Sequence, residues 1–433
     1  GLEGVRAMWE DAARTPLKTM LTTPSCVPAV LGVEDTGSSI DASQVAESMR
    51  WDSVVALGEM MNFPGILSCE QNALDEVRET LKADRVVTGH YVAADDDRGL
   101  SAYIAAGVTS CHESGSFTDV ISKLRMGMYV QLRQGSAWLN LPGYLPELVA
   151  SGVDTSHCLL CTDDSHPHTL VDDGHMDRVL REAVRLGLDP ITALQMATIN
   201  AAQYFGVGRD MGSITPGKCA DIVLLRDLER FEAKAVYIDG TLAAEDGKAT
   251  FATKPFTWPA FMTHTMNLGV DITPRAFEIP VNHKDGSIWV RAIGINAGDT
   301  LTRDSTVKTI VRDGKIQADP THDVLKACVF DRHHGTDGTH SFGFVTGFGI
   351  HGALAQTVSH DAHNLLVMGD NDADMALAAR ALAECGGGEV AVADGKVLAL
   401  VELPVCGLMS DRRIEEVAEK VAGIEAAWAQ MGC

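Results

Sequence analysis

Acidic and histidine side chains follow four short apolar runs in the first 165 residues. Glu59 follows SVVALG, His90 follows RVVTG, His112 follows VTSC and Asp163 follows CLLCT. Carboxylate oxygens and imidazole nitrogens are suitable ligands for Mn²⁺, Fe²⁺ or Zn²⁺. A bound divalent ion lowers the pKa of its water ligand toward about 7 and polarises an electrophile. The residue types therefore point to metal-dependent hydrolysis.

These side chains could divide the chemistry between them. A carboxylate such as Glu59 can bridge two ions roughly 3.5–4 Å apart, as in two-metal hydrolases. Asp163 could hold one ion, take the proton of the attacking water and pass it to the leaving group. Each residue also has a simpler explanation: Glu59 as a surface acid, His90 as a loop residue, and the Asp163–Asp164 pair as a helix cap. Their joint placement after successive apolar runs favours the metal site.

The elements that would position these residues are short strands alternating with helices over the first 205 residues. Alternation of this kind predicts parallel strands, in an open doubly wound sheet or in a barrel. Catalytic groups of β/α barrels gather at the carboxyl ends of the strands, so four candidates at four strand ends favour a (β/α)8 barrel. The candidate strands are Leu17–Thr23, Ser53–Gly58, Arg85–Gly89, Val108–Cys111, Met128–Leu132 and His157–Thr162.

Helical patterns fill the intervals between the candidate strands. Leu100–Ala106 and Phe117–Arg125 are two such segments. In HMDRVLREAVRLG the apolar residues repeat every three or four positions, which is typical of an amphipathic helix. Asp189 and Pro190 have the types preferred at the cap and first position of a helix, which we expect to run to about Tyr204.

The pattern changes after the helical region, so we expect three domains: a barrel over residues 1–211, a β-sandwich portion over 212–255 and an α+β domain over 256–433. GSITPGKCADIVLL and AKAVYIDGTLAAEDGKATF read as short strands with glycine-rich turns. The last region mixes strands, such as SIWVRAIGI, with helices, such as DADMALAARALAE.

Composition narrows the classes of molecule that the protein could bind and the compartment in which it could work. The net charge of −24 argues against nucleic acid, which needs basic patches. No apolar stretch approaches the roughly 20 residues of a membrane span. The ten scattered cysteines suggest free thiols in a reducing cytoplasm, with Cys158 and Cys161 as core residues rather than zinc ligands.

Two other motifs match known ligand-binding patterns, but a turn and a helix cap explain them more simply. Gly347–Gly352 matches GxGxxG, but too few residues follow for a crossover helix, so we expect a glycine-rich turn. DNDADM from Asp370 begins like a calcium loop but has Met375 at the sixth position, so we expect a helix cap. The HxE…PCxxC signature of zinc nucleobase deaminases is absent.

Several motifs together resemble the adenine deaminases of the amidohydrolase superfamily, and the resemblance covers essentially the whole chain. They are GEMMNFPGIL, AYIAAGVTSCHE, CTDDSHP, GHMDRVLREAVRLGLDPITALQMATINAAQYFG, GSITPGKCADIVLL, HHGTDGTHSFGFVTGFGI, TVSHDAHNLLVMGDNDADMALA and LPVCGLMSD. The resemblance implies conversion of adenine and water to hypoxanthine and ammonia at a two-metal centre, usually Mn²⁺ or Fe²⁺, with Zn²⁺ also possible.

Carried over to this sequence, the resemblance makes Glu59 the bridging carboxylate and His90 and His112 metal ligands. Asp163 becomes a ligand and the proton shuttle, and Glu113 a hydrogen-bond donor to a ring nitrogen of the base. Asp164 would orient the following loop and is the candidate substrate-binding residue. Where the family often has an acid this chain has His168, so His168 receives no role.

The chain departs from the family in one respect, since it lacks the His-x-His pair of the family's first strand. His166 and His168 have that spacing but follow the last candidate strand. Six βα units where a barrel needs eight lead us to expect a barrel lacking its first two strands in this chain. The alternatives are an inactive truncated homologue with an incomplete metal site and an amidohydrolase that acts on another cyclic amidine or amide. The expected partners are adenine and a second copy of the chain, as a dimer, with no nucleic acid or membrane.

Overall fold

The computed structural model describes residues 1–93, 96–296, 302–335 and 340–433, which fall into two compact units. Unit 1 comprises Gly1–Glu34 and Ser38–Thr257, and unit 2 comprises Asp35–Gly37 and Trp258–Cys433. None of the helices in the described ranges has the length and apolar character needed to cross a membrane.

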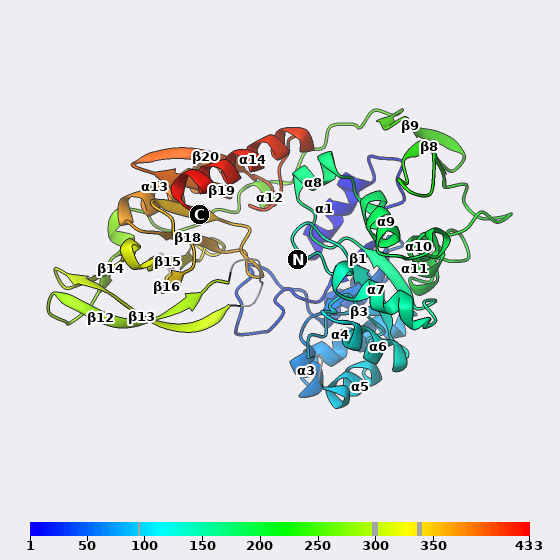
Figure 1. Cartoon of the computed structure of the whole chain (residues 1–433), viewed down its shortest axis with the longest axis horizontal. Coiled ribbons are helices and arrows are strands. Elements are labelled where there is room, and N and C mark those ends of the chain that lie inside the picture. The colour runs from blue at the N-terminus through cyan, green and yellow to red at the C-terminus, as the bar shows by residue number, and fades with distance from the viewer. Residues whose placement is uncertain (94–95, 297–301, 336–339) are drawn as a thin grey trace. The chain divides into compact units, whose positions relative to one another are not determined.

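Unit 1 contains the expected run of parallel strands, shown in blue to green in Figure 1. Its strands form two sheets, β1-β2-β3 and β4-β5-β6, which a parallel bridge between Val87 and Val108 links. Order in space therefore equals order along the chain. All the expected strands are confirmed, although the first begins at Leu21 rather than Leu17. They are β1 (Leu21–Pro24), β2 (Val54–Met60), β3 (Val86–Gly89), β4 (Ser110–Cys111), β5 (Tyr129–Arg133) and β6 (Cys158–Cys161).

These strands do not close into a complete barrel. In the described part of unit 1, β1 and β6 are the two outer strands and do not pair with each other. The unit is thus a mixed α/β structure with an open parallel arrangement. The helices of this region are α1 (Leu2–Ala12), α2 (Ala42–Ser48), α3 (Phe63–Leu67), α4 (Gln71–Lys82), α5 (Asp97–Ala105), α6 (Phe117–Arg125), α7 (Leu141–Ser151), α8 (Pro167–Asp172), α9 (Met176–Arg185), α10 (Pro190–Ala197) and α11 (Ile199–Tyr204).

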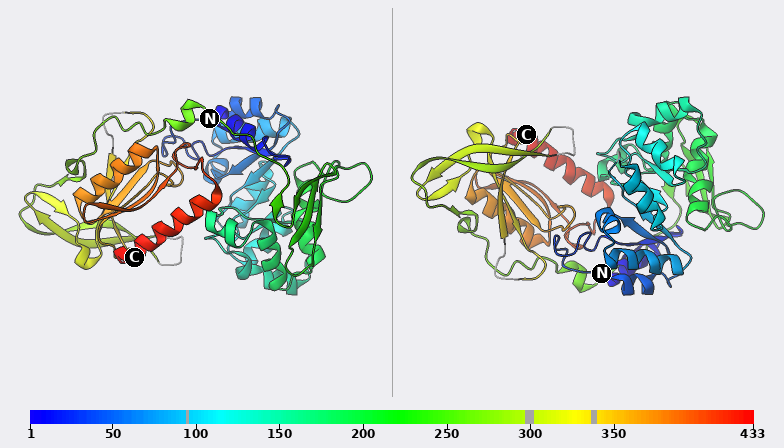
Figure 2. Two further views of the ribbon diagram at one scale, coloured as in Figure 1. Left: turned by 90° about the horizontal axis from the view of Figure 1, so that it is seen from above. Right: turned by 90° about the horizontal axis from the view of Figure 1, so that it is seen from below.

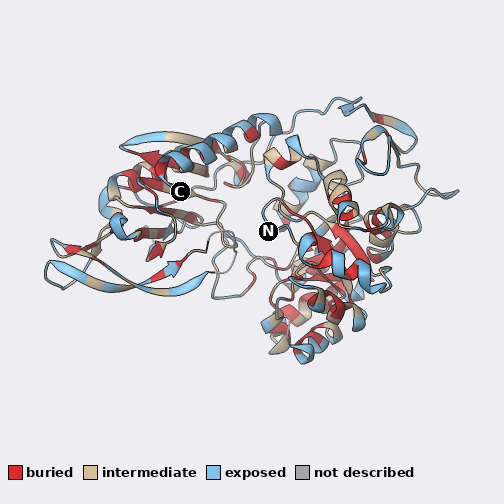
Figure 3. Cartoon of the chain, in the orientation of Figure 1, coloured by how far each residue is buried: buried red, intermediate tan, exposed pale blue. Residues whose placement is uncertain are grey.

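The core of unit 1 forms where helices cover the strands, which are largely buried (Figure 3). Every residue of β2 is buried except Glu59, which is half-buried. Burial on both faces explains why the strand reads as a continuous apolar run instead of an alternating one. The strands contribute to two clusters, one around Leu57 and Val87 and the other around Val130 and Leu160.

The helix expected from Pro190 to Tyr204 is divided in two. Asp189 accepts a hydrogen bond from the backbone N–H of Thr192 at 2.9 Å, so the predicted cap is confirmed. Thr198 then leaves the helical region with φ −131° and ψ −89°. Its hydroxyl donates to the carbonyl of Leu194 at 2.6 Å. Hydroxyl groups that bond back to this carbonyl compete with the backbone ladder and bend helices.

A small antiparallel sheet completes unit 1. Its strands lie in the order β10-β9-β8-β7. A hairpin turn with positive φ at Asp239 and Gly240 connects β8 to β9, and another at Asp246 and Gly247 connects β9 to β10. The strands are β7 (Ile222–Leu225), β8 (Ala233–Ile238), β9 (Thr241–Glu245) and β10 (Lys248–Ala249).

Unit 2 is built on one large sheet, in the order β11-β14-β13-β12-β16-β15-β18-β17-β19-β20. All its pairs are antiparallel except β12 with β16. The strands are β11 (Ile279–Pro280), β12 (Gly286–Gly294), β13 (Arg303–Arg312), β14 (Lys315–Gln317), β15 (Leu325–Phe330), β16 (His340–Thr346), β17 (Ala353–Gln356), β18 (Leu365–Gly369), β19 (Gly388–Ala393) and β20 (Lys396–Glu402).

Two long helices pack on this sheet (Figure 2). α13 (Asp372–Cys385) packs on Val390 and Val392, whereas α14 (Ile414–Met431) packs near Ala391 of the same strand. Alternate residues of a strand point to opposite faces, so the two helices cover opposite faces of the sheet. The shorter helical segments are α12 (Ala260–Thr263) and the 3-10 turns Pro274–Phe277 and Pro320–His322.

The two motifs that we expected to be structural are confirmed as such. Gly347, Gly349 and Gly352 all have positive φ, and the strand β17 follows them directly instead of a helix. At the second motif the side chain of Asn371 caps α13, accepting from the backbone N–H of Asp374 at 2.9 Å.

A buried carboxyl group makes the stability of unit 1 sensitive to pH. Glu76 lies on α4 with 2% of its surface exposed and accepts one hydrogen bond, from Asn72 at 2.7 Å. Burial, reinforced by the nearby charges of Glu70 and Asp41, raises its pKa from about 4.5 to about 8. The stability contributed by the neutral form is complete below about pH 4.5 and is lost as the pH rises toward 8.

The substitution Glu76→Gln should therefore stabilise the protein near neutral pH. It keeps the acceptor for Asn72 and removes the ionisation, so the free energy of unfolding should rise by about 2–4 kcal/mol at pH 7.5 and change little at pH 4.5. Chemical denaturation at both pH values measures this. Glu47→Gln, on the exposed side of α2, is the matched control and should show no such difference. Equal effects of Glu76→Gln at both pH values would contradict the argument.

Candidate metal centre

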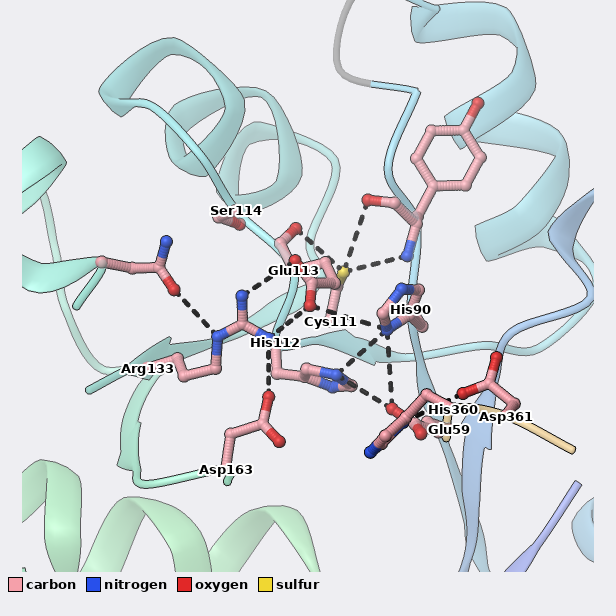
Figure 4. A network of polar contacts seen from close by, with 12 residues as sticks. Glu59, His90, Cys111, His112, Glu113, Ser114, Arg133, Asp163, His360 and Asp361 are labelled. Carbon is pink, nitrogen blue, oxygen red and sulfur yellow. Dashed lines mark hydrogen bonds and ion pairs between the residues drawn. The ribbon is translucent and has the colours of Figure 1, made fainter. Parts of the chain in front are cut away.

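Three of the predicted ligands converge at the carboxyl ends of neighbouring strands (Figure 4). Glu59 Oε2 lies 2.9 Å from His112 Nε2 and 3.5 Å from His90 Nδ1. The two imidazole nitrogens lie 3.1 Å apart. One ligand atom from each residue fits within 4.8 Å of the others. A carboxylate and two imidazoles form a donor set that suits a divalent transition metal.

Strand geometry explains this convergence. His90 directly follows β3 and His112 directly follows β4, as expected, whereas Glu59 is the penultimate residue of β2 rather than the residue after it. The backbone N–H of His90 donates to the hydroxyl of Tyr103 at 3.1 Å. That buried tyrosine also donates to the carbonyl of Met60, so it links the ends of β2 and β3.

Glu59 is held in its charged form. Its burial alone would raise the pKa, but hydrogen bonds from His112 and His90 outweigh burial and lower the pKa to about 2. The group is therefore a carboxylate over the whole physiological range of pH. A permanent negative charge between two imidazoles is what a cation site requires.

A second group of possible ligands adjoins the first. It consists of His112, Glu113 and Asp163, again with one atom from each within 4.8 Å of the others. Asp163 lies two residues beyond β6 and has φ +59°, a left-handed conformation that Asp and Asn adopt more readily than most residues. The two groups share His112, so Glu59, His90, His112, Glu113 and Asp163 form one continuous cluster.

Asp164 has a different environment. Its carbonyl accepts from the backbone N–H of Ser136 at 2.9 Å, which ties the loop after β6 to the loop after β5. Helix α8 begins at Pro167 after His166, and no side chain caps it, so the pair of aspartates does not form a helix cap. Neither His166 nor His168 belongs to a group in the described ranges that could hold a metal ion.

Arg133 is the polar residue of this cluster that our sequence reasoning missed. It is the last residue of β5, between the strands that carry Glu113 and Asp163, and its side chain is 5% exposed. Its guanidinium contacts both oxygens of Glu113 and donates to Asp163 Oδ2 at 2.6 Å. The available signal was its position at the end of a buried strand, but we searched those positions only for metal-ligand types.

The backbone of Glu113 is also fixed. The buried ammonium group of Lys123 donates to the Glu113 carbonyl and lies 3.0 Å from Asp119 Oδ2. Lys123 and Asp119 belong to α6, and the side chain of Ser116 caps the N-terminus of that helix. The helix that follows β4 therefore holds the loop that carries Glu113.

A cavity of about 310 Å³ adjoins this cluster. Small-molecule sites usually measure roughly 300–1,000 Å³, so a compact ligand fits. Its walls come from Thr22, Pro24, Cys26, Gly58, Glu59, Thr88, His112, Gln131 and Phe205. No group of possible metal ligands in the described ranges contains a cysteine, Cys26 included.

Comparison with known proteins agrees with this site. The amidohydrolase family model matches residues 2–243, and the adenine deaminase C-terminal domain model matches residues 299–433. An adenine deaminase of Clostridium botulinum strain Loch Maree is 51% identical over 434 aligned residues, covering all of this chain and 72% of its own. Those of Moorella thermoacetica and Rhizobium meliloti (adenine deaminase 3) are 44% and 41% identical, again over all of this chain and 73% of theirs.

These matches extend over both units and include every residue of the metal-ligand cluster. The amidohydrolase family implies a divalent metal, which agrees with the carboxylate and imidazole donors at the ends of β2, β3 and β4. The chain belongs to the amidohydrolase family and, within it, to the adenine deaminases.

Proposed function

We propose that this protein hydrolyses adenine to hypoxanthine and ammonia, as a step of purine salvage. The observation that carries the proposal is the convergence of Glu59, His90, His112 and Asp163 at the carboxyl ends of β2, β3, β4 and β6. The match along the whole chain to proteins named adenine deaminase supports the choice of substrate. We further propose that the parallel strands are part of the (β/α)8 barrel predicted from the sequence.

The metal centre of this proposal contains two ions, Mn²⁺ or Fe²⁺, with Zn²⁺ as the alternative. Glu59, His90 and His112 would hold them, with Asp163 as a further ligand. The overlap of the two ligand groups at His112 supports a centre larger than one triad. When bound, the ions supply Lewis-acid chemistry that makes water a stronger nucleophile and C6 of the base more electrophilic.

The side chains of the protein transfer the protons of the reaction. Water adds its oxygen to C6, and the bond from C6 to the exocyclic amino group then breaks. One proton of the water leaves with the amino group as ammonia, and the other ends on the ring nitrogen beside C6 of hypoxanthine. We assign to Asp163 the transfer of a water proton to that leaving nitrogen. Asp163 belongs to the ligand cluster, and its carboxylate accepts a hydrogen bond from Arg133. Both observations support this role.

Glu113 is assigned to the edge of the base. Both its oxygens accept hydrogen bonds from Arg133, which fixes the orientation of the group. The hydrogen bond from Glu113 to a ring nitrogen of the base stays a prediction. Asp164 stays a predicted substrate contact, supported by its place in the loop after β6.

Ammonia release from a panel of bases tests the proposed function. The metal-loaded protein should deaminate adenine with a kcat/KM at least about 100-fold above that for guanine, cytosine or adenosine, because a site that hydrogen-bonds one base edge leaves polar groups unpaired with another. A coupled assay for ammonia measures all four substrates. A preference for another cyclic amidine, or no release from adenine, would overturn the assignment.

A further inference from the structure

Arg133 joins two carboxylates that come from different strands. Glu113 follows β4 and Asp163 follows β6, whereas Arg133 ends β5 between them. Its Nη2 donates to Glu113 Oε2 at 3.1 Å and its Nη1 donates to Asp163 Oδ2 at 2.6 Å (Figure 4). Nη1 also donates to the other oxygen of Glu113, so that contact is bidentate. Bidentate pairs restrict orientation as well as distance.

Two residues hold the guanidinium and a third holds the backbone of Arg133. Its Nε donates to Asn140 Oδ1 at 2.8 Å, and the ring centroid of Trp138 lies 5.3 Å from its Cζ. The backbone N–H of Arg133 donates to the hydroxyl of Tyr144, which is buried in α7, at 3.0 Å. The segment that follows β5 thus fixes the cation before any substrate arrives.

We propose that Arg133 is a positioning residue for the deamination, keeping Glu113 and Asp163 in one rigid arrangement with respect to C6 of the base. The proposal rests on the proposed function of the site. Two carboxylates this close repel each other, and each would turn away if no cation lay between them. Arg133 engages only Oδ2 of Asp163, which leaves Oδ1 available for the metal centre.

A planar guanidinium is required for this arrangement. A lysine ammonium is a compact point charge and cannot bind both oxygens of Glu113 while it also reaches Asp163. Misplacement of a reacting group by about 1 Å can cost about 100-fold in rate. The structure therefore predicts that charge alone, without the forked shape, does not maintain turnover.

The test compares Arg133→Lys and Arg133→Ala with the unmodified metal-loaded protein. We expect kcat for adenine to fall about 100-fold in Arg133→Lys and more in Arg133→Ala, with KM within about threefold. The manganese content per subunit should stay the same. Guanidinium ion added to Arg133→Ala should restore kcat at least about tenfold, because it can occupy the vacated space. Arg125→Gln, an exposed arginine of α6, is the control for the loss of an arginine.

Substitutions of Asn140 test the proposal if the two Arg133 variants do not fold. Asn140→Ala keeps Arg133 but removes the acceptor of its Nε, so kcat should fall about tenfold, and Asn140→Asp should regain most of that loss. A kcat within threefold of normal in Arg133→Lys, or in Asn140→Ala if only that variant folds, would overturn the proposal. So would a failure of guanidinium to restore Arg133→Ala.

Crystal structures separate this proposal from the proposed function. In Arg133→Lys, or Asn140→Ala if the first does not fold, we expect Glu113 to leave its present position and Asp163 Oδ2 to turn away from the place where Arg133 now holds it. Unchanged positions would overturn the positioning role even if adenine is the substrate. An unmodified protein that does not deaminate adenine would refute the proposed function instead, while the side-chain positions would still report on Arg133.

Discussion

The substitution Asp163→Asn should lower kcat for adenine by about 10³–10⁴-fold, because general acid–base catalysis contributes on this order and the amide cannot carry the proton. The fold should be unaffected. Asn tolerates the left-handed backbone conformation at this position, with φ +59°, and its carbonyl oxygen can still accept from Arg133. Initial rates at saturating adenine measure the effect, and thermal unfolding monitors the fold.

Asp172→Asn provides the control for this experiment. Asp172 is an exposed carboxylate at the end of α8, outside the ligand cluster, so the same chemical change there should leave kcat within about twofold. Retention of more than about a third of normal turnover by Asp163→Asn would remove Asp163 from the proton transfer.

Loss of bound metal is the expected result of Glu59→Gln. Glu59 is the one carboxylate of its triad, and its pKa of about 2 gives a full negative charge at any working pH. The neutral amide lacks that charge, so the metal content should fall from about two ions per subunit to less than one, and kcat should fall at least about 100-fold. Elemental analysis after gel filtration measures the ions.

A substitution of a surface acid provides the control for the measurement of metal content. Glu79→Gln changes an acid that pairs with Lys82 on α4, and it should retain the normal metal content. Exhaustive chelation of the unmodified protein should reproduce the inactivity of Glu59→Gln, and added Mn²⁺ should reverse it only in the unmodified protein. Full retention of both ions by Glu59→Gln would refute the bridging assignment.

Much of the site could be predicted from the sequence because parallel strands end at one edge. Once GEM, GH, CHE and CTDD were placed after apolar runs, the meeting of Glu59, His90, His112 and Asp163 followed from the geometry of the sheet. Arg133 lies in an equivalent position after YVQL. It was missed because an arginine is no metal ligand, and its role depends on contacts with residues 20 and 30 positions away.

Other features depended on information that local patterns do not contain. The break at Thr198 arises from one hydroxyl that bonds back to Leu194, although the apolar spacing continues through it. The strand order of unit 2 places β12 beside β16 and β17 beside β19, so it depends on pairings between distant segments. Periodicity identified strands such as β12, but it does not specify their neighbours.

The equality of chain order and spatial order in unit 1 has a consequence for how such proteins can diverge. Each strand-and-helix module from β2 to β6 contributes its own side chains to the site: Glu59 with β2, His90 with β3, His112 and Glu113 with β4, Arg133 with β5 and Asp163 with β6. Insertions in one intervening helix lengthen the interval between two donors without displacing the others. Searches for distant members of this group should therefore match the identity of residues at successive strand termini and leave the gaps between them free.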